Sequence, residues 1–208
     1  SVERAFTIVQ MLADAQDGLS LAEIARQLEL NKAIAVKLLN TLEHLALVWR
    51  DDRAQRFYLT YRISNLGLRQ LQKSRLLDQC VPGLEDLAEA TGELVRLAVV
   101  EGGERITWVI AIAGAKRSLQ IDPNYTLEIG LHTHATGKAW LSTMPFESAL
   151  KLMLRQGIRQ LTQHSRVAIG DIKADLERSA QLGFATSYEE NEFGVGAIAV
   201  PIMAPTLE

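Results

Sequence analysis

Two signals for the start of a helix lie close together in the first third of the chain. Ser20 and Glu23 have the spacing of a capping box, in which each side chain accepts a hydrogen bond from the other residue's backbone N–H. Asn31, a residue type strongly preferred at the N-cap, follows eleven positions after Ser20. The segment between them has room for one short helix and a tight turn, and the chain after Asn31 begins another helix.

The helix after Asn31 is expected to have two different faces. Its apolar residues recur every three or four positions and predict a buried face, made of Ile34, Leu38, Leu42 and Leu45. At about 100° per residue, the opposite side carries small, basic and amide residues, namely Lys32, Ala33, Val36, Lys37 and Asn40. Small residues let a helix enter the major groove, while Asn pairs with adenine and Lys reaches guanine or phosphate. This pair of helices predicts a helix-turn-helix motif.

An amphipathic helix is predicted in front of this motif, over residues 2–14. Its apolar residues follow the helical spacing and are Val2, Ala5, Phe6, Val9 and Leu12. Asp17 and Gly18 end it with a turn signal.

A basic hairpin is predicted after the motif. Residues 47–50 and 57–59 read as two short strands, and the polar connection between them contains Arg53 and Arg56. Such a hairpin forms the wing of a winged helix-turn-helix, and its arginines can reach phosphates or the minor groove. The predicted DNA contacts are therefore Ser20, Asn31, Lys32, Ala33, Val36, Lys37, Asn40, Arg53 and Arg56.

The charge of the chain is divided unevenly along its length. Residues 1–75 hold 11 Lys and Arg against 8 Asp and Glu, a balance of +3, whereas residues 76–208 have a balance of −6. The total of −3 therefore hides a basic first third. This division favours contact with phosphates through the first third alone.

Composition narrows the class of protein further. Apolar residues make up 48% of the 208 residues, enough for two small domains with buried cores. Cys80 is the single cysteine, so the chain has no internal disulfide framework. We find neither a signal-peptide pattern nor an apolar run long enough to span a bilayer, and expect a cytoplasmic protein without membrane contact.

The remainder of the sequence predicts a second, mixed domain. Helices are expected at 62–75, 76–91, 135–143, 146–156 and 171–182. Strands are expected at 94–100, 106–112, 117–121, 126–131, 184–188 and 196–202. This order predicts an α+β fold in which an antiparallel sheet is flanked by helices.

Several motifs in a fixed order resemble the IclR family of bacterial transcriptional regulators. They are residues 19–25 (LSLAEIA), 37–43 (KLLNTLE), 132–139 (HTHATGKA) and 189–195 (EENEFGV). The resemblance implies a winged helix-turn-helix domain over 1–61, a linker helix over 62–75 and a sensor-like effector-binding domain over 76–208. It also implies a further strand after Glu208, so we expect the effector-binding domain to be incomplete at its C-terminal end.

The resemblance implies a site for a small organic-acid effector on the sheet of the second domain. Carried over to this sequence, its lining is Ile121, Ile129, Leu131, His132, Thr133, Ser187, Glu190 and Ala197. Apolar walls with a few convergent polar groups suit such a ligand. The implied protein is a homodimer or homotetramer that binds a double-stranded operator as a repressor or an activator, with no cofactor and no metal.

Two alternatives remain open at this point. The chain is a small-molecule-binding enzyme, or a protein-interaction module whose helical N-terminus does not bind DNA. The sequence contains no Gly-x-Ser-x-Gly elbow, and Cys80 has no adjacent histidine. His132 and His134 have no third metal ligand near them in sequence, so we assign no catalytic and no metal-binding residue.

Overall fold

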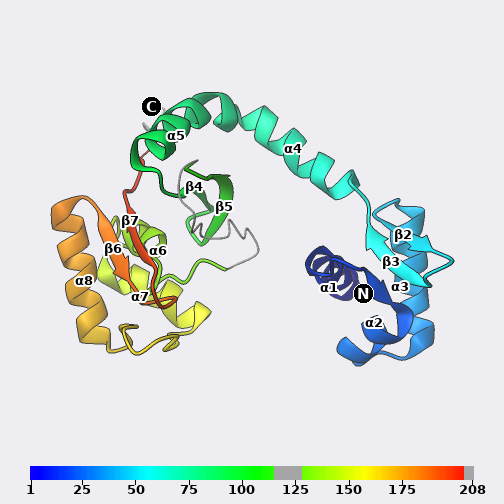
Figure 1. Cartoon of the computed structure of the whole chain (residues 1–208). Helices are drawn as coiled ribbons and strands as arrows, with labels where there is room; N and C mark the ends of the chain where they lie inside the picture. The colour runs from blue at the N-terminus through cyan, green and yellow to red at the C-terminus, as the bar shows by residue number, and fades with distance from the viewer. Residues whose placement is uncertain (115–127, 204–208) are drawn as a thin grey trace. The chain divides into compact units, whose positions relative to one another are not determined.

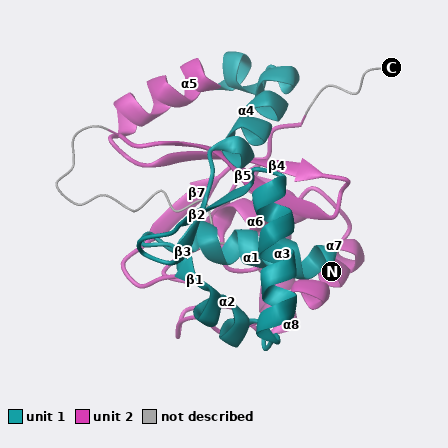
Figure 2. Cartoon of the chain, turned by 90° about the vertical axis from the view of Figure 1, so that its right-hand side faces the viewer, with its two compact units in different colours: residues 1–80 teal, residues 81–208 magenta. Residues whose placement is uncertain are grey.

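The computed structural model describes residues 1–114 and 128–203. The chain divides into two compact units, residues 1–80 and 81–208 (Figures 1 and 2), and each is described by itself. No helix within the described ranges is long and apolar enough to cross a membrane. The predicted strand at 117–121, and Ile121 with it, lie outside the described residues.

Unit 1 contains the predicted winged helix-turn-helix. Its elements are α1 (Val2–Asp14), β1 (Leu19–Ser20), α2 (Leu21–Gln27), α3 (Lys32–His44), β2 (Val48–Asp51), β3 (Arg56–Leu59) and α4 (Arg62–Ser74). β3 lies between β1 and β2 in an antiparallel sheet. Leu19 pairs with Phe57, so the chain before α2 is joined to the wing. Gly18 makes this approach possible, because a Cβ on its left-handed backbone would lie 2.5 Å from the carbonyl oxygen of Phe57.

Both predicted helix starts are present. The Ser20 N–H donates to Glu23 Oε2 at 2.7 Å, and the Glu23 N–H donates back to Ser20 Oγ at 3.3 Å. Asn31 Oδ1 accepts from the Ala33 N–H at 2.7 Å. These caps fix where α2 and α3 begin, and so set the short turn between them.

The predicted buried face of α3 is confirmed at Leu42 and in part at Leu38, and is wrong at Ile34 and Leu45. Ala35, Leu39 and Leu42 are buried, whereas Ile34 and Leu45 are 41% and 49% exposed. Two apolar stripes run along this helix about 100° apart, and periodicity alone does not choose between them. Because α2 packs against α3, the stripe with the small side chain of Ala35 is the one that faces inward.

A single core holds unit 1 together. Its buried members come from three helices and both long strands, and are Ile8, Leu12, Ile24, Leu39, Leu42, Val48 and Phe57. In α1 the inward residues are Ile8 and Leu12, while Val2 and Phe6, which the predicted stripe included, are about two-thirds exposed. α1 therefore keeps an uncovered apolar edge.

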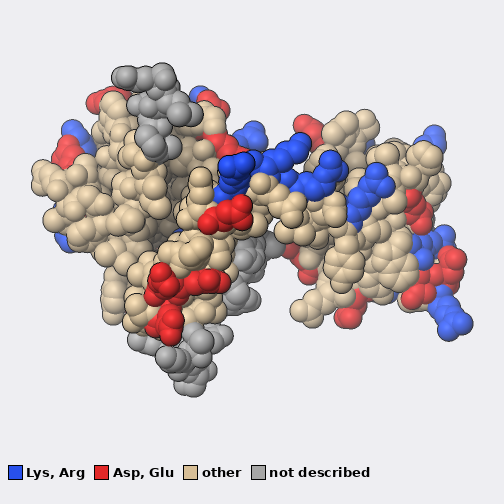
Figure 3. Space-filling view, turned by 90° about the horizontal axis from the view of Figure 1, so that it is seen from above, with Lys and Arg blue, Asp and Glu red and all other residues tan. Residues whose placement is uncertain are grey.

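Thr60 connects the wing domain to α4. Its N–H donates to the Leu47 carbonyl at 3.0 Å, and its hydroxyl donates to the Ala46 carbonyl at 2.7 Å. The same hydroxyl accepts from the Arg62 N–H at 3.3 Å. α4 buries none of its own residues. It has basic side chains and no acidic ones, and the basic side chains gather along the helix in Figure 3. Its surface is therefore available to a partner.

Unit 2 has mixed helices and antiparallel strand pairs, as an α+β fold requires. Its elements, with α5 crossing the boundary, are α5 (Leu76–Thr91), β4 (Val95–Glu101), β5 (Arg105–Ile112), α6 (Ala135–Leu141), α7 (Phe146–Gln156), α8 (Ile169–Leu182), β6 (Ala185–Tyr188) and β7 (Gly196–Ala199). β4 pairs with β5, and β6 with β7. α6 packs against β6, β7 and α8 (Figure 1). The apolar core lies among the helices and contains Leu131, Trp140, Leu141, Ala149, Met153, Ile172 and Leu176.

Two predicted strands of unit 2 differ from the structure. The described part of 126–131 is not a strand, because side chains bind its backbone groups: Gln156 contacts the Ile129 carbonyl and Leu131 N–H, and His134 Nδ1 accepts from the Gly130 N–H. β7 ends at Ala199 instead of 202, close to Pro201, which has no N–H to donate to a partner strand.

Candidate DNA-binding face and effector site

The outward face of α3 carries the residues predicted for contact with DNA. Lys32, Ala33, Val36, Lys37 and Asn40 are all exposed. Neither lysine has an ion pair within the described ranges. Exposed cations on a helix with small neighbours can approach phosphates and base edges without first breaking an internal pair.

Ser20 and Asn31 are engaged differently. Both side-chain oxygens accept hydrogen bonds from backbone N–H groups at the starts of α2 and α3. Their direct contact with DNA stays a prediction, while in the structure Ser20 caps the start of α2 and Asn31 caps the start of α3.

The wing places its two predicted arginines in different settings. Arg53 is exposed at the tip, where Asp51 Oδ1 accepts from its backbone N–H at 2.8 Å. The Arg56 guanidinium instead donates to the carbonyls of Asp17 and Gly18 at 2.8 and 3.0 Å. It also lies 3.2 Å from Glu23 Oε2. Arg56 thus holds the turn before β1, and any contact with DNA competes with these three interactions.

The pKa of the Glu23 carboxylate, which caps α2, depends on its contacts with Ser20 and Arg56. The hydrogen bonds from the Ser20 N–H and hydroxyl, followed by the positive charge of Arg56, lower the pKa of Glu23. Glu23 is therefore ionised at neutral pH and remains an acceptor for both partners.

Sequence reasoning missed Arg50. This side chain lies on β2, over the ring of Phe57 at 5.7 Å, and its guanidinium contacts Gln55 and Asp52. The signal was available, because alternation along the strand puts residues 48 and 50 on one face. The sequence does not give the register between β2 and β3, so it did not show that this face of β2 borders α3.

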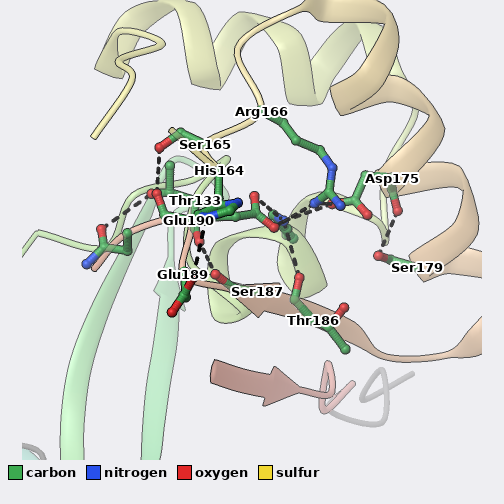
Figure 4. A network of polar contacts seen from close by, with 12 residues as sticks. Thr133, His164, Ser165, Arg166, Asp175, Ser179, Thr186, Ser187, Glu189 and Glu190 are labelled. Carbon is green, nitrogen blue, oxygen red and sulfur yellow. Dashed lines mark hydrogen bonds and ion pairs between the residues drawn. The ribbon is translucent and has the colours of Figure 1, made fainter. Parts of the chain in front are cut away.

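In unit 2 the structure brings most predicted effector residues into one region. Six of them are buried, namely Ile129, Leu131, His132, Thr133, Ser187 and Glu190. Ala197 on β7 is exposed. The Ser187 hydroxyl donates to the Thr133 carbonyl at 2.6 Å, which ties β6 to the segment before α6 (Figure 4).

Glu190 belongs to a buried ionic network that the sequence did not reveal (Figure 4). Lys138 Nζ contacts both carboxylate oxygens of Glu190, at 2.6 and 2.7 Å, and lies 2.8 Å from Asp175 Oδ2. Arg166 contacts the same two carboxylates, at 2.6 and 3.1 Å. Two cations face two anions, so the network is neutral. The Glu190 carboxylate is already paired, and its contact with an effector stays a prediction.

The backbone next to Glu190 is also fixed. The Ser165 hydroxyl donates to the Glu190 carbonyl at 2.6 Å (Figure 4). The Thr162 hydroxyl donates to the Glu189 carbonyl at 2.6 Å. Glu189 itself has a positive φ of 53°. The segment between β6 and β7 is therefore held in one conformation by the loop before α8.

The two neighbouring histidines do not share a task. His132 Nε2 lies 2.9 Å from the Arg159 carbonyl, which requires the proton on Nε2. The buried Nδ1 has no hydrogen-bond partner among residues 1–114 and 128–203. Burial, aided by the positive charge of Arg96, lowers the pKa of His134, so its Nδ1 accepts the Gly130 N–H as a neutral ring. Within the described ranges, no three His, Cys, Asp or Glu residues are grouped to hold a metal ion.

Comparison with known proteins gives a consistent result over the whole chain. The profile for the C-terminal domain of the bacterial transcriptional regulator IclR matches residues 68–206, and that for the IclR helix-turn-helix domain matches residues 1–52. The HTH-type transcriptional repressor AllR of Escherichia coli K12 is 25% identical over 97% of this chain and 74% of its own length. The acetate operon repressor of Salmonella typhimurium is 24% identical over 96% of this chain and 73% of its own.

Solved structures share the fold. An IclR transcriptional regulator from Alicyclobacillus acidocaldarius has a TM-score of 0.83 at 24% identity, covering 96% of this chain and 80% of its own. An IclR homologue from Microbacterium hydrocarbonoxydans, solved with 4-hydroxybenzoate, has a TM-score of 0.81 at 17% identity, covering 98% and 83%. The relatives are transcriptional regulators and not enzymes, which removes both alternatives left open by the sequence. The chain belongs to the IclR family of DNA-binding transcriptional regulators.

Proposed function

We propose that the chain represses transcription by binding a duplex operator through α3 and the wing, and that a small organic acid bound in unit 2 changes the operator affinity. The observation that carries the proposal is the exposed face of α3, where Lys32 and Lys37 lie among small and amide side chains without an ion pair in the described ranges. The names of the curated relatives, which are repressors, support the direction of regulation.

The DNA-binding part is tested with duplexes selected from a random library, measured by fluorescence anisotropy over a range of salt concentrations. Each phosphate contact contributes about 0.9 to the slope of log affinity against log salt. We expect Lys37→Ala and Arg53→Ala to lower that slope or to relax base preference, with unchanged unfolding. Lys151→Ala, an exposed lysine on α7, is the matched control. Wild-type affinity in both test variants would refute the assigned contacts.

The effector part rests on His132 and the apolar residues beside it. His132 is 4% exposed, and its Nδ1, which has no partner in the described part of the chain, is an acceptor that a hydroxyl group of a ligand can satisfy. Ile129 and Leu131 supply buried apolar surface next to it. The relative that was solved with 4-hydroxybenzoate supports a carboxylic acid of similar size as the ligand.

Calorimetry with a panel of small organic acids, beginning with 4-hydroxybenzoate, tests this site. His132→Gln keeps an N–H for the Arg159 carbonyl but removes the Nδ1 acceptor, so we expect weaker binding with little loss of stability. His164→Gln, on a 43% exposed side chain, is the control. If no acid binds wild type, or if His132→Gln binds as tightly as wild type, the site lies elsewhere.

We also propose that the protein is a cytoplasmic homodimer that associates further to a tetramer, with domains at 1–61, 62–75 and 76–208. Val2 and Phe6 of α1, together with Leu66 and Leu68 of α4, are all more than half exposed and provide the apolar contacts between copies. Light scattering should show smaller particles for Phe6→Ser or Leu68→Ser, and the Leu154→Ser variant is the control. Unchanged mass in both would contradict these contacts.

Ligand control follows from linkage between the two sites. An effector alters operator affinity only through its different affinity for the two arrangements of the dimer. Operator DNA must then weaken effector binding by the same factor by which the effector weakens operator binding.

A further inference from the structure

A groove separates α3 from the wing. It has a volume of about 110 Å³, and its walls are Leu21, Val36, Leu39, Asn40, Glu43, Arg50, Gln55 and Phe57. Val36, Asn40 and Glu43 follow one another at i, i+4 and i+7, so one stripe of α3 forms the helical wall. The opposite wall belongs to β2 and β3.

Arg50 is the cation in this groove. Its guanidinium is held against the Phe57 ring at 5.7 Å and by Gln55, and Nε lies 3.4 Å from Asp52 Oδ1. The side chain is still 42% exposed, and that of Asp52 is 88% exposed, so the ion pair is a weak surface pair. Arg50 is therefore oriented by the ring and the amide while its charge stays available.

The position of the groove determines what crosses it. With α3 in the major groove and the wing at the neighbouring minor groove, the ridge between the two DNA grooves is one sugar–phosphate strand. That strand must pass over the gap between the helix and the wing. This step rests on the proposed function, because it takes the DNA-facing surface as given.

We propose that the groove between α3 and the wing seats one phosphate of the operator, and that Arg50 is the cation that binds it. The Asn40 amide on the facing wall is a second donor to the same phosphate. Phosphate contacts of this kind fix the register of a protein on DNA and carry no base preference. Arg50 thus replaces Arg56, which is engaged inside the domain, as the inner basic contact of the wing.

Two carboxylates act against this contact by repelling a phosphate. Glu43 lines the same groove, and Asp52 lies on the wing. Glu43 has no ion pair within the described ranges, so its charge repels an incoming phosphate. Removing that charge should therefore act in the opposite direction from removing Arg50.

The test uses the full chain with a labelled 30-base-pair duplex of random sequence, for which binding depends on phosphates alone. We expect Arg50→Gln to lower the salt slope by about 0.9 and to weaken binding roughly eightfold at about 0.1 M salt. Arg50→Lys should restore the slope, because a phosphate accepts any cation. Glu43→Gln should tighten binding, and Lys151→Gln should match wild type. Thermal unfolding of each variant checks the fold.

Three results would overturn the proposal. An unchanged salt slope in Arg50→Gln would show that no phosphate reaches the groove. A change in preference at one base pair of the selected operator duplexes, with the slope on random duplex unchanged, would mean that Arg50 contacts a base edge instead. Weaker binding by Glu43→Gln would show that the Glu43 carboxylate attracts the DNA. The DNA group beside it would then be a hydrogen-bond donor and not a phosphate. Absence of any duplex binding by wild type would refute the proposed function itself.

Discussion

The cations of α3 and the cations around Glu190 show opposite ways of using positive charge. Lys32 and Lys37 are exposed on α3, and water solvates them. Lys138 is 2% exposed and contacts three carboxylate oxygens as well as the Thr186 carbonyl. Leaving a charge unpaired costs little in water and several kcal/mol in a protein interior.

This difference in burial distinguishes lysines that are available to bind a ligand from lysines that stabilise the fold. A lysine on α3 meets a phosphate by exchanging water and ions, so its removal should change affinity and leave unfolding alone. Lys138 has no donor left for a ligand, so its removal should change unfolding first. The predictions below test this division from the largest expected effect to the smallest.

Lys138→Met should destabilise the protein by about 3–5 kcal/mol, because it leaves two buried carboxylates with Arg166 as their one remaining cation in the network. Urea unfolding followed by circular dichroism measures the loss. The matched control is Lys173→Met, which removes an exposed pair with Glu177 at 3.8 Å. That change also removes the ammonium from above the Phe146 ring, 5.6 Å away, and should cost no more than about 1 kcal/mol in total. Equal losses in the two variants would show that burial does not distinguish them.

Arg56→Ala should lower stability by about 1–3 kcal/mol, because the carbonyls of Asp17 and Gly18 lose a charged donor. Arg53→Ala, at the tip of the same wing, should stay within about 0.5 kcal/mol of wild type. Thermal unfolding and DNA affinity are measured on both. If Arg56→Ala unfolds like wild type and still loses affinity for DNA, Arg56 is a contact residue after all.

Ser20→Ala should cost about 1 kcal/mol, since it removes the acceptor for the Glu23 N–H at the start of α2. Ser20→Thr keeps a hydroxyl and should recover most of the loss. Urea unfolding of both variants separates the cap from any contact with DNA. A full loss of operator affinity at unchanged stability would reverse this assignment.

His134 should make stability depend on pH by a small amount. Burial lowers its pKa below 6.5, so the unfolded state binds a proton first as the pH falls. Its stabilising effect is complete above about pH 6.5 and is lost toward the lower pKa of the folded state. His134→Asn keeps an acceptor for the Gly130 N–H and should flatten the pH profile of the urea midpoint. A profile as steep as that of wild type would assign the dependence to another group.

Local signals in the sequence predicted the local structure well. The caps of α2 and α3 depend on residues two or three positions apart, and both are present as expected. The inward face of α3 was predicted only in part. Leu42 is buried as expected, but Ile34 and Leu45 are exposed, because the packing of α2 favours the stripe that contains Ala35 and Leu39.

Contacts between distant residues were the part that sequence reasoning missed. Arg56 binds carbonyls 38 and 39 positions away, and Lys138 binds a carboxylate 52 positions away. One signal for the second contact was present. Lys138 is the single charged residue in the helix ATGKAWL, and a lone charge among small and apolar residues indicates burial beside a counter-ion. The sequence offers no comparable sign of which acid supplies it.

The hydrogen bonds of Thr60 have a mechanical consequence. They join the residues that follow α3, Ala46 and Leu47, to Arg62 at the start of α4. α4 has 13 residues and so acts as a rod about 20 Å long. Displacing its far end by about 1 Å would turn the rod by about 3°. The hydrogen bonds of Thr60 to Ala46 and Leu47 would pass part of this rotation to the end of α3. If α3 enters the major groove as proposed, a small shift at the far end of α4 is enough to tilt α3 against the DNA.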